Sequence, residues 1–232
     1  MTTKSTCILC HLLPKSLYYP QLFEQFARVG KVLGSAHRLE LLELLAQGER
    51  TVEDLARLAK LPIANVSQHL QQLRRAALVV TRKQGLYVHY SLASPAVSVL
   101  LSAIQQIADR HLGEVEKLVR TYLTSKDDFE PVSRRELLSR ARDGLVTVLD
   151  VRPVEEYRAG HVAGAINVEL KDLPKRLHEF KRNREIVAYC RGPFCILAYE
   201  AVAQLRAKGF KARRLEDGFP EWKCAGLPVA MR

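Results

Sequence analysis

Residues 185–195 read EIVAYCRGPFC, an apolar run followed by a short loop that begins and ends in cysteine. A helical pattern starts at about Cys195 and continues to Lys208. Strand, tight loop and helix in this order predict a parallel sheet covered by helices. In such sheets a ligand usually binds beyond the carboxyl end of a strand, where backbone N–H groups and the positive end of the next helix converge. The stretch therefore predicts an α/β fold with an anion-binding loop.

Cys190 stands at the start of this loop. Loop N–H groups and the adjacent Arg191 stabilise a thiolate in such a place, so we predict that Cys190 is a nucleophile and that Arg191 stabilises its anionic form. Gly192 is expected to let the backbone curl around the sulfur. The remaining predicted site residues are those of the loop: Gly192, Pro193, Phe194 and Cys195. Cys195 either pairs with Cys190 as a resolving thiol or fills space at the first helical turn.

The alternation of strand and helix continues on both sides of the loop. Residues 145–151 are mostly apolar and β-branched, as in a buried strand, and a further strand is predicted at residues 211–215, whereas residues 173–180 have a helical pattern. Ser133, with Glu136 three residues later, predicts a capped helix before the first of these strands. The second half of the chain is therefore predicted to be one α/β domain.

Short helices and a hairpin in the first half form a different pattern. Thr51, with an acid three residues later, predicts a helix that ends near Ala59, and a second helix follows over residues 63–76. Residues 78–83 and 86–92 alternate in polarity around a glycine and predict a hairpin. Helix, turn, helix and hairpin in this order predict a mainly α, winged helix-turn-helix domain.

One face of the helix predicted at residues 63–76 carries amide, hydroxyl and basic groups, and no acid occurs from Pro62 to Tyr90. Such groups read base edges in the major groove. Arg82 and Lys83, at the hairpin tip, have no acid nearby and suit phosphate contact. The predicted DNA-binding residues are Asn65, Ser67, Gln68, His69, Gln71, Gln72, Arg74, Arg75, Arg82 and Lys83. For His69, packing at the flank of the helix is an equal alternative.

Composition sets the limits within which these patterns are interpreted. The 232 residues carry a formal net charge of +11, which favours polyanion partners, and five cysteines, an odd and low number. We find no signal peptide and no apolar run that could span a bilayer, so we expect a cytoplasmic protein without a membrane partner. A polar seam that ends at Pro131 separates the two patterns. The predicted divisions are a tail (1–18), the winged helix-turn-helix domain (19–125) and the α/β domain (126–232).

The first domain resembles the ArsR family of bacterial repressors. The resemblance rests on GSAHRL at residues 34–39, VSQHL at 66–70 and YVHYSL at 87–92. It implies a homodimer that binds double-stranded operator DNA and releases it when an inducer binds. The long apolar pattern from Pro95 to about Tyr122, predicted as one helix, suits the dimer interface.

The metal sites of ArsR relatives are incomplete in this sequence. Asp109 and His111 match half of one such site, but Tyr122 and Ser125 stand where the other half would lie. We therefore predict no metal ion and no cofactor in this domain or the next. Cys7 and Cys10 are either a zinc or redox pair or part of a disordered terminus.

The second domain resembles the rhodanese family. LDVR at residues 149–152, GHVAGAIN at 160–167 and GFPEW at 218–222 carry the resemblance. It implies that Cys190 takes sulfane sulfur from a small donor such as thiosulfate, a persulfide or a polysulfide, and holds it as a persulfide. Ile196 replaces the arginine of the related Cys-x5-Arg phosphatase loop, which disfavours a phosphatase. Asp150 with Arg152 is expected to be a structural ion pair, and His161 a fold residue.

Together these patterns predict a transcriptional regulator, a repressor, whose rhodanese-like domain senses or transfers sulfane sulfur through Cys190. Three alternatives stay open. The chain is a sulfurtransferase enzyme with an accessory DNA-binding domain, or a metalloid-responsive regulator that uses Cys190 and Cys195, or a regulator whose rhodanese fold is an inert interaction module. Cys224 has no evident partner in the sequence, and we interpret it as structural.

Overall fold

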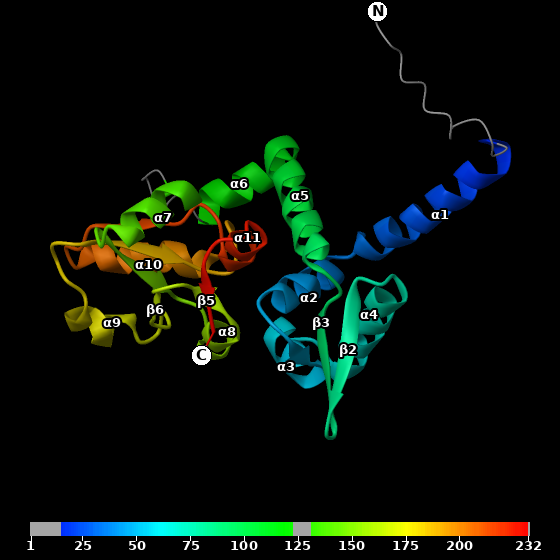
Figure 1. Cartoon of the computed structure of the whole chain (residues 1–232), viewed down its shortest axis with the longest axis horizontal. Helices are drawn as coiled ribbons and strands as arrows, with labels where there is room; N and C mark the ends of the chain where they lie inside the picture. The colour runs from blue at the N-terminus through cyan, green and yellow to red at the C-terminus, as the bar shows by residue number, and fades with distance from the viewer. Residues whose placement is uncertain (1–14, 123–130, 232) are drawn as a thin grey trace, which may run out of the picture.

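The computed structural model describes residues 15–122 and 131–231 (Figure 1). Cys7 and Cys10 lie outside the described residues.

The N-terminal part consists of α1 (Lys15–Leu33), α2 (Ala36–Ala46), β1 (Arg50–Thr51), α3 (Val52–Ala59), α4 (Ile63–Arg75), β2 (Val79–Gln84), β3 (Tyr87–Leu92), α5 (Pro95–His111) and α6 (Gly113–Tyr122). α1 starts at Lys15, within the stretch of residues 1–18 predicted as a tail, and Pro20 lies inside this helix.

The helix-turn-helix forms as predicted, because its capping and its apolar face agree. The Thr51 hydroxyl accepts a hydrogen bond from the Asp54 backbone N–H at 3.2 Å and so caps α3. On α4, Val66, Leu70 and Leu73 are fully buried in the core of this domain. The opposite face of α4 is thereby left to solvent.

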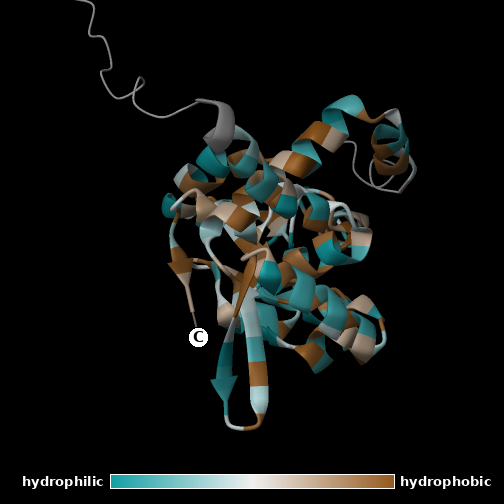
Figure 2. Cartoon of the chain, turned by 90° about the vertical axis from the view of Figure 1, so that its right-hand side faces the viewer, coloured by the Kyte–Doolittle hydropathy of each residue, from teal (hydrophilic) through white to brown (hydrophobic). Residues whose placement is uncertain are grey.

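The hairpin forms the wing of this domain. β3 pairs with β2 on one side and with the short β1 on the other, both antiparallel. Gly85 has φ +59° in the tight turn, a conformation that glycine adopts without strain. The wing projects from the body of the molecule in two perpendicular views (Figures 1 and 2).

The single helix predicted from Pro95 to Tyr122 is wrong, because the structure has two helices there. α5 ends at His111, Leu112 takes an extended conformation (φ −107°, ψ 105°), and α6 starts at Gly113. Glycine has a low helix propensity, and its position beside Leu112 marks the break. The apolar pattern continues across the break, so periodicity alone did not reveal it.

The C-terminal part is a parallel sheet between two layers of helices, as predicted. Its sheet has the order β6-β4-β7-β8, with all neighbours parallel. Its elements are α7 (Arg134–Arg142), β4 (Val146–Asp150), α8 (Val154–Ala159), β5 (His161–Val162), β6 (Ile166–Asn167), α9 (Leu173–Arg176), a 3-10 turn (Leu177–Glu179), β7 (Glu185–Tyr189), α10 (Ile196–Ala207), β8 (Ala212–Arg214), α11 (Phe219–Cys224) and β9 (Val229–Ala230).

Alternate residues of β7 enter different cores because side chains alternate along a strand. Ile186, Ala188 and then Cys190 pack with α9 and α10, whereas Val187 and Tyr189 pack on the side of α7, α8 and α11. The two halves of the molecule meet where α11 packs against α5 (Figure 1). Within the described ranges, no helix is long and apolar enough to cross a membrane.

Candidate functional site

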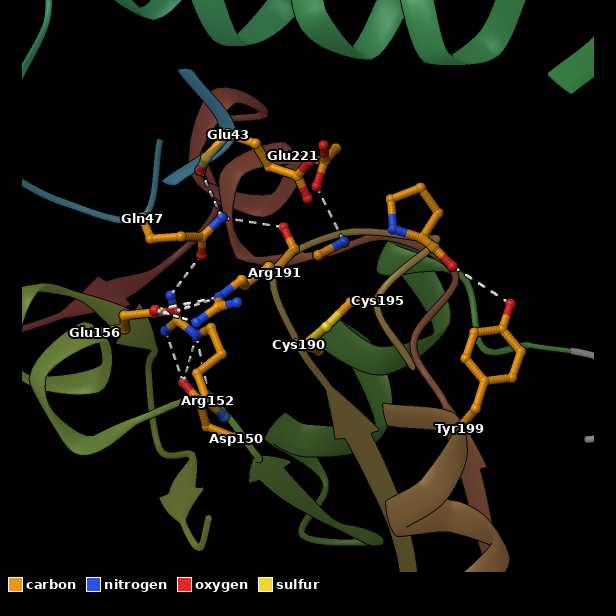
Figure 3. The surroundings of a disulfide bond; sticks show 12 residues. Glu43, Gln47, Asp150, Arg152, Glu156, Cys190, Arg191, Cys195, Tyr199 and Glu221 are labelled. Carbon is orange, nitrogen blue, oxygen red and sulfur yellow. Dashed lines mark hydrogen bonds and ion pairs between the residues drawn. A yellow bond between two sulfur atoms is a disulfide. The ribbon is translucent and has the colours of Figure 1, made fainter. Parts of the chain in front are cut away.

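Cys190 and Cys195 form a disulfide at the carboxyl end of β7 (Figure 3). Their Cα atoms are 6.2 Å apart. Cys190 is 1% exposed, whereas Cys195 is partly exposed and is the N-cap residue of α10. The sequence left open whether Cys195 pairs with Cys190 or only fills space at the first helical turn. In the structure Cys195 is paired with Cys190.

Backbone contacts from the N-terminus of α11 hold the loop in place. The Phe219 backbone N–H donates to the Cys190 carbonyl oxygen at 3.1 Å. A Cβ added to Gly218 would lie 2.3 Å from the Gly192 nitrogen and 2.4 Å from the Arg191 carbonyl. The same Cβ added to Gly192 would meet nothing within 4 Å. The close approach that requires a glycine therefore occurs at Gly218.

The Arg191 side chain points toward Glu156 rather than toward the disulfide (Figure 3). Its guanidinium donates to the two Glu156 carboxylate oxygens at 2.7–3.1 Å, and the Glu156 side chain is fully buried. Arg50 of the N-terminal part reaches the same carboxylate at 3.2 Å. The Arg191 guanidinium is thus engaged with Glu156 in this form, and a role in stabilising the Cys190 thiolate stays a prediction.

Beneath the loop, Asp150 and Arg152 form the expected buried ion pair. Their closest nitrogen and oxygen are 2.7 Å apart, and neither side chain is exposed. The Tyr189 hydroxyl donates to Asp150 at 2.5 Å, and burial, followed by the charge of Asp150, raises the Tyr189 pKa. His161 is buried, with its Nδ1 2.8 Å from the Tyr157 carbonyl oxygen. These groups support the loop and are packed away from solvent.

The predicted DNA-binding residues gather on α4 and the wing. Ser67 and His69 are partly buried, and the others, from Asn65 to Lys83, are exposed. Burial, with Arg38 and His37 nearby, lowers the His69 pKa, and the His69 ring lies 5.7 Å from the His37 ring. The packing alternative for His69 thus has direct contacts to support it.

Two of the predicted DNA-binding residues have partners elsewhere in the chain. The Gln72 side-chain oxygen accepts a hydrogen bond from Arg38 at 2.7 Å. Arg82 forms an ion pair with Glu49 at 2.5 Å, so the expectation of no nearby acid was wrong. Glu49 lies 33 residues before Arg82, and the pairing of β1 with β3 brings it beside the wing.

Comparisons with known proteins match both halves. The family model for "Bacterial regulatory protein, arsR family" matches residues 35–81, and the model for "Rhodanese-like domain" matches residues 133–225. The HTH-type transcriptional regulator Rv0324 of Mycobacterium tuberculosis is 45% identical over 208 residues, which cover 90% of this chain and 91% of that protein. The chain belongs to the ArsR family. It is a transcriptional regulator with a C-terminal rhodanese-like domain.

Two further relatives each cover one domain of this ArsR-family regulator. A protein named "Sulfurtransferase" from Allochromatium vinosum is 29% identical over 108 residues, which cover 46% of this chain and 95% of that protein. The solution structure of a Mycobacterium bovis fragment (1–100), described as a homodimeric winged helix-turn-helix domain, is 39% identical. It covers 44% of this chain and 94% of that chain, with a TM-score of 0.41.

Gln47, at the end of α2, joins the DNA-binding domain of the regulator to residues 190–195, the loop closed by the disulfide, which we call the sulfur loop. Its side chain is 2% exposed. Its amide nitrogen donates to the Arg191 carbonyl oxygen at 3.2 Å, and its amide oxygen accepts from Arg152 at 3.1 Å (Figure 3). Sequence reasoning missed Gln47, because the contact joins residues 144 positions apart and a glutamine after a helix carries no local signal.

Two carboxyl groups lie at the same contact, Glu43 from α2 and Glu221 from α11 (Figure 3). Burial raises the pKa of both. Arg191 partly offsets this for Glu43, and the Gly218 N–H, which donates to Glu221 at 3.0 Å, does so for Glu221. The contact between the domains therefore favours protonated carboxyl groups.

A cleft of about 660 Å³ lies between α5 and the rhodanese-like domain. Pro193, Phe194 and Tyr199 line it on the loop side, but neither Cys190 nor Cys195 does. The side chains in residues 15–122 and 131–231 form no group of three or more potential metal ligands. Cys224 has an exposed free thiol, 3.9 Å from the Pro95 carbonyl oxygen.

Proposed function

We propose that this regulator is a cytoplasmic repressor whose DNA affinity depends on sulfane sulfur received by Cys190. One observation carries the proposal. The loop that holds the Cys190–Cys195 pair also accepts, through the Arg191 carbonyl, a hydrogen bond from Gln47 of the DNA-binding domain. A covalent change at the sulfur atoms thus acts within one residue of the contact between the domains.

The chemistry needs only the two thiols and a donor. The Cys190 thiolate attacks the outer sulfur of thiosulfate, the S–S bond of the donor breaks, and sulfite leaves, so that Cys190 holds a persulfide anion. The Cys195 thiol then attacks the Cys190 sulfur, the Cys190–Cys195 disulfide forms, and HS⁻ leaves with the thiol proton. In this scheme the second step produces the Cys190–Cys195 disulfide, and a reducing thiol restores the starting form.

On the DNA side we propose a homodimer on a roughly palindromic operator. Apolar side chains on α1, α5 and α6 support a second copy: Phe23, Phe26, Ile107 and Leu118 are each more than half exposed. The exposed polar face of α4 would contact bases, and Lys83 on the wing would contact phosphate.

The test is operator affinity, measured by gel shift with and without a polysulfide donor. We expect the donor to weaken binding by the wild type about tenfold, a size typical of coupling between two sites, and to leave Cys190→Ser unaffected. Cys224→Ser is the matched control and should respond like the wild type, because that thiol lies outside the loop. Equal affinity for wild type and Cys190→Ser under both conditions overturns the proposal.

Cys195→Ser separates the two chemical steps. Without the second thiol the reaction stops at the Cys190 persulfide, so the intact mass increases by one sulfur atom. The wild type instead ends two hydrogen atoms lighter than its dithiol form. Added sulfur on Cys190→Ser would place the reactive thiol elsewhere.

A sulfurtransferase enzyme is the second candidate, favoured by the match to the rhodanese-like family model over residues 133–225. Rapid transfer of sulfur from thiosulfate to cyanide, together with DNA binding that is indifferent to Cys190→Ser, would support it. The regulator proposal predicts slow turnover, because Cys190 is 1% exposed and lies outside the cleft between the domains.

A further inference from the structure

Four residues between α2 and α3, Gln47 to Arg50, contact both the sulfur loop and the wing. We call residues 47–50 the joint. Its members have different partners: Gln47 and Arg50 contact the rhodanese-like domain through their side chains, whereas the Glu49 side chain contacts the wing. The joint is the stretch of the DNA-binding domain that touches both functional parts of the regulator.

On the rhodanese side, the contacts are buried and charged. Gln47 binds the Arg191 carbonyl and receives a hydrogen bond from Arg152. Arg50, 10% exposed, shares the buried Glu156 carboxylate with Arg191. A displacement of Arg191 therefore changes the hydrogen bonds of both Gln47 and Arg50. Buried polar groups lose free energy when they are left without hydrogen bonds, because water cannot reach them to replace the lost partner. A movement of the loop therefore favours a matching movement of the joint, which keeps these hydrogen bonds.

Gly48 lets the joint lie directly on the rhodanese-like domain. A Cβ at this position would be 3.0 Å from the Ala159 Cβ, and φ is +154°. Both the close approach and the backbone conformation favour glycine here. The joint thus lies in direct contact with α8 as well as with the sulfur loop.

On the wing side, the joint holds a basic residue that was expected to contact DNA. The Glu49 carboxylate binds Arg82 with two hydrogen bonds, at 2.5 and 3.3 Å, and lies 3.5 Å from His89. Next to Glu49, Arg50 pairs with Tyr90 in the β1–β3 ladder, which fixes the joint beside the wing. The Glu49 carboxylate and a DNA phosphate would compete for the same Arg82 guanidinium donors.

We propose that the joint transmits the state of the sulfur loop to the wing, with Glu49 capturing Arg82 in the disulfide form and releasing it in the dithiol form. This inference rests on the proposed function. The disulfide closes the loop in the geometry seen here, in which Gln47, Arg50 and Glu49 all have their partners. Breaking the disulfide frees the loop, the Arg191 carbonyl moves, and the joint shifts so that Arg82 can bind phosphate. The disulfide form is then the form that binds DNA weakly.

The experiment measures operator affinity for the purified full chain as dithiol and as disulfide. For the wild type we expect about a tenfold difference in favour of the dithiol. Glu49→Gln should raise the affinity of the disulfide form to that of the dithiol, because a neutral amide holds Arg82 weakly. Gln47→Ala should also bring the ratio near one, with the disulfide still forming between Cys190 and Cys195.

Glu53→Gln is the matched control. Glu53 lies four residues from Glu49, is exposed on the first turn of α3, and its replacement changes the net charge by the same amount. It should keep the wild-type ratio. A second measurement is the salt dependence of binding, since one released phosphate contact changes the slope by about one. The wild-type slope should be smaller for the disulfide than for the dithiol, and Glu49→Gln should remove that difference.

The outcomes separate the two proposals. If wild-type affinity is the same in both forms, the proposed function fails and the inference fails with it. If the wild type shows the difference and both Glu49→Gln and Gln47→Ala retain it, only the role of the joint is overturned. Glu49 is a surface residue whose side chain is 32% exposed, so Glu49→Gln is expected to fold even if Gln47→Ala does not.

Discussion

Gly218 shows how a single residue can determine the shape of a reactive loop far from it in sequence. Its Cα faces the backbone of Arg191 and Gly192, and a Cβ would come within 2.3–2.4 Å of their atoms. Backbone atoms cannot rotate away as a flexible side chain can. The loop must therefore shift if Gly218 gains a side chain.

We predict that Gly218→Ala destabilises the rhodanese-like domain by about 1–3 kcal/mol, the usual cost of overpacking. In a chain of this size that lowers the melting temperature by roughly 2–12 °C. The measurement is thermal unfolding followed by circular dichroism. Gly113→Ala is the control, since a Cβ there meets nothing within 4 Å. Identical melting temperatures for the two variants would contradict the close approach at Gly218.

A site residue could be identified from the sequence only where a pattern in the neighbouring residues marks its role. Cys190 and Cys195 were identified because a strand, a loop and a helix follow one another in the chain. Gln47 and Gly218 were not, because their roles come from contacts with residues 144 and 26 positions away in sequence. The motif GFPEW at residues 218–222 indicates the family resemblance, but it does not indicate which residues Gly218 contacts in the folded chain.

At the scale of elements, the prediction succeeded where capping and periodicity agreed. α3, α4 and β7 start and end within one residue of their predicted bounds, because Thr51 caps α3, Pro62 precedes α4 and Cys190 follows β7. The strands β1, β5 and β9 have two residues each, too few for an alternating pattern. The break between α5 and α6 was hidden by a continuous apolar pattern.

α4 and the wing should affect DNA binding in different ways. Gln68 is exposed on α4, where an amide can bond an adenine edge, and Lys83 is exposed on the wing. We expect Gln68→Ala to weaken operator binding by about 1–3 kcal/mol while leaving random DNA unaffected. Lys83→Ala should weaken binding to both and reduce the salt slope by about one. Fluorescence anisotropy with operator and scrambled duplexes measures both effects.

The same response to both duplexes in both variants would contradict this division of roles. Asn65 offers a further comparison, because it is exposed at the first turn of α4, the end of a recognition helix that usually enters the groove. Asn65→Ala should then behave like Gln68→Ala and not like Lys83→Ala.

At the scale of the whole molecule, the two domains meet through polar and charged groups. Gln47, Arg50 and Glu156 lie at the contact and are largely buried. Composition and the polar seam predicted two domains, but neither one indicates which surfaces touch. The choice of contacting surfaces depends on buried charged groups that pair across the contact, and these groups come together only in the folded chain.

Glu43 and Glu221 make this contact sensitive to pH. Burial raises the pKa of both above the ordinary value of 4.5, so the folded protein binds more protons than the unfolded chain between that value and the raised pKa. Their contribution to stability is full below pH 4.5 and is lost as the pH rises through the raised pKa. Higher pH therefore weakens the contact between the domains.

We predict that Glu43→Gln, which is neutral at every pH, removes part of this loss. The melting temperature of the variant should exceed that of the wild type by an amount that grows as the pH rises above 4.5 and then levels off once Glu43 is fully ionised in the folded protein. Thermal unfolding over a pH series measures the difference, with Glu53→Gln as the exposed control that should follow the wild type. A difference that stays constant over the series would show that folding does not raise the Glu43 pKa, and one that grows as the pH falls would show that folding lowers it. In that last case Arg191 would hold Glu43 as an ion pair, and the contact would weaken in acid instead.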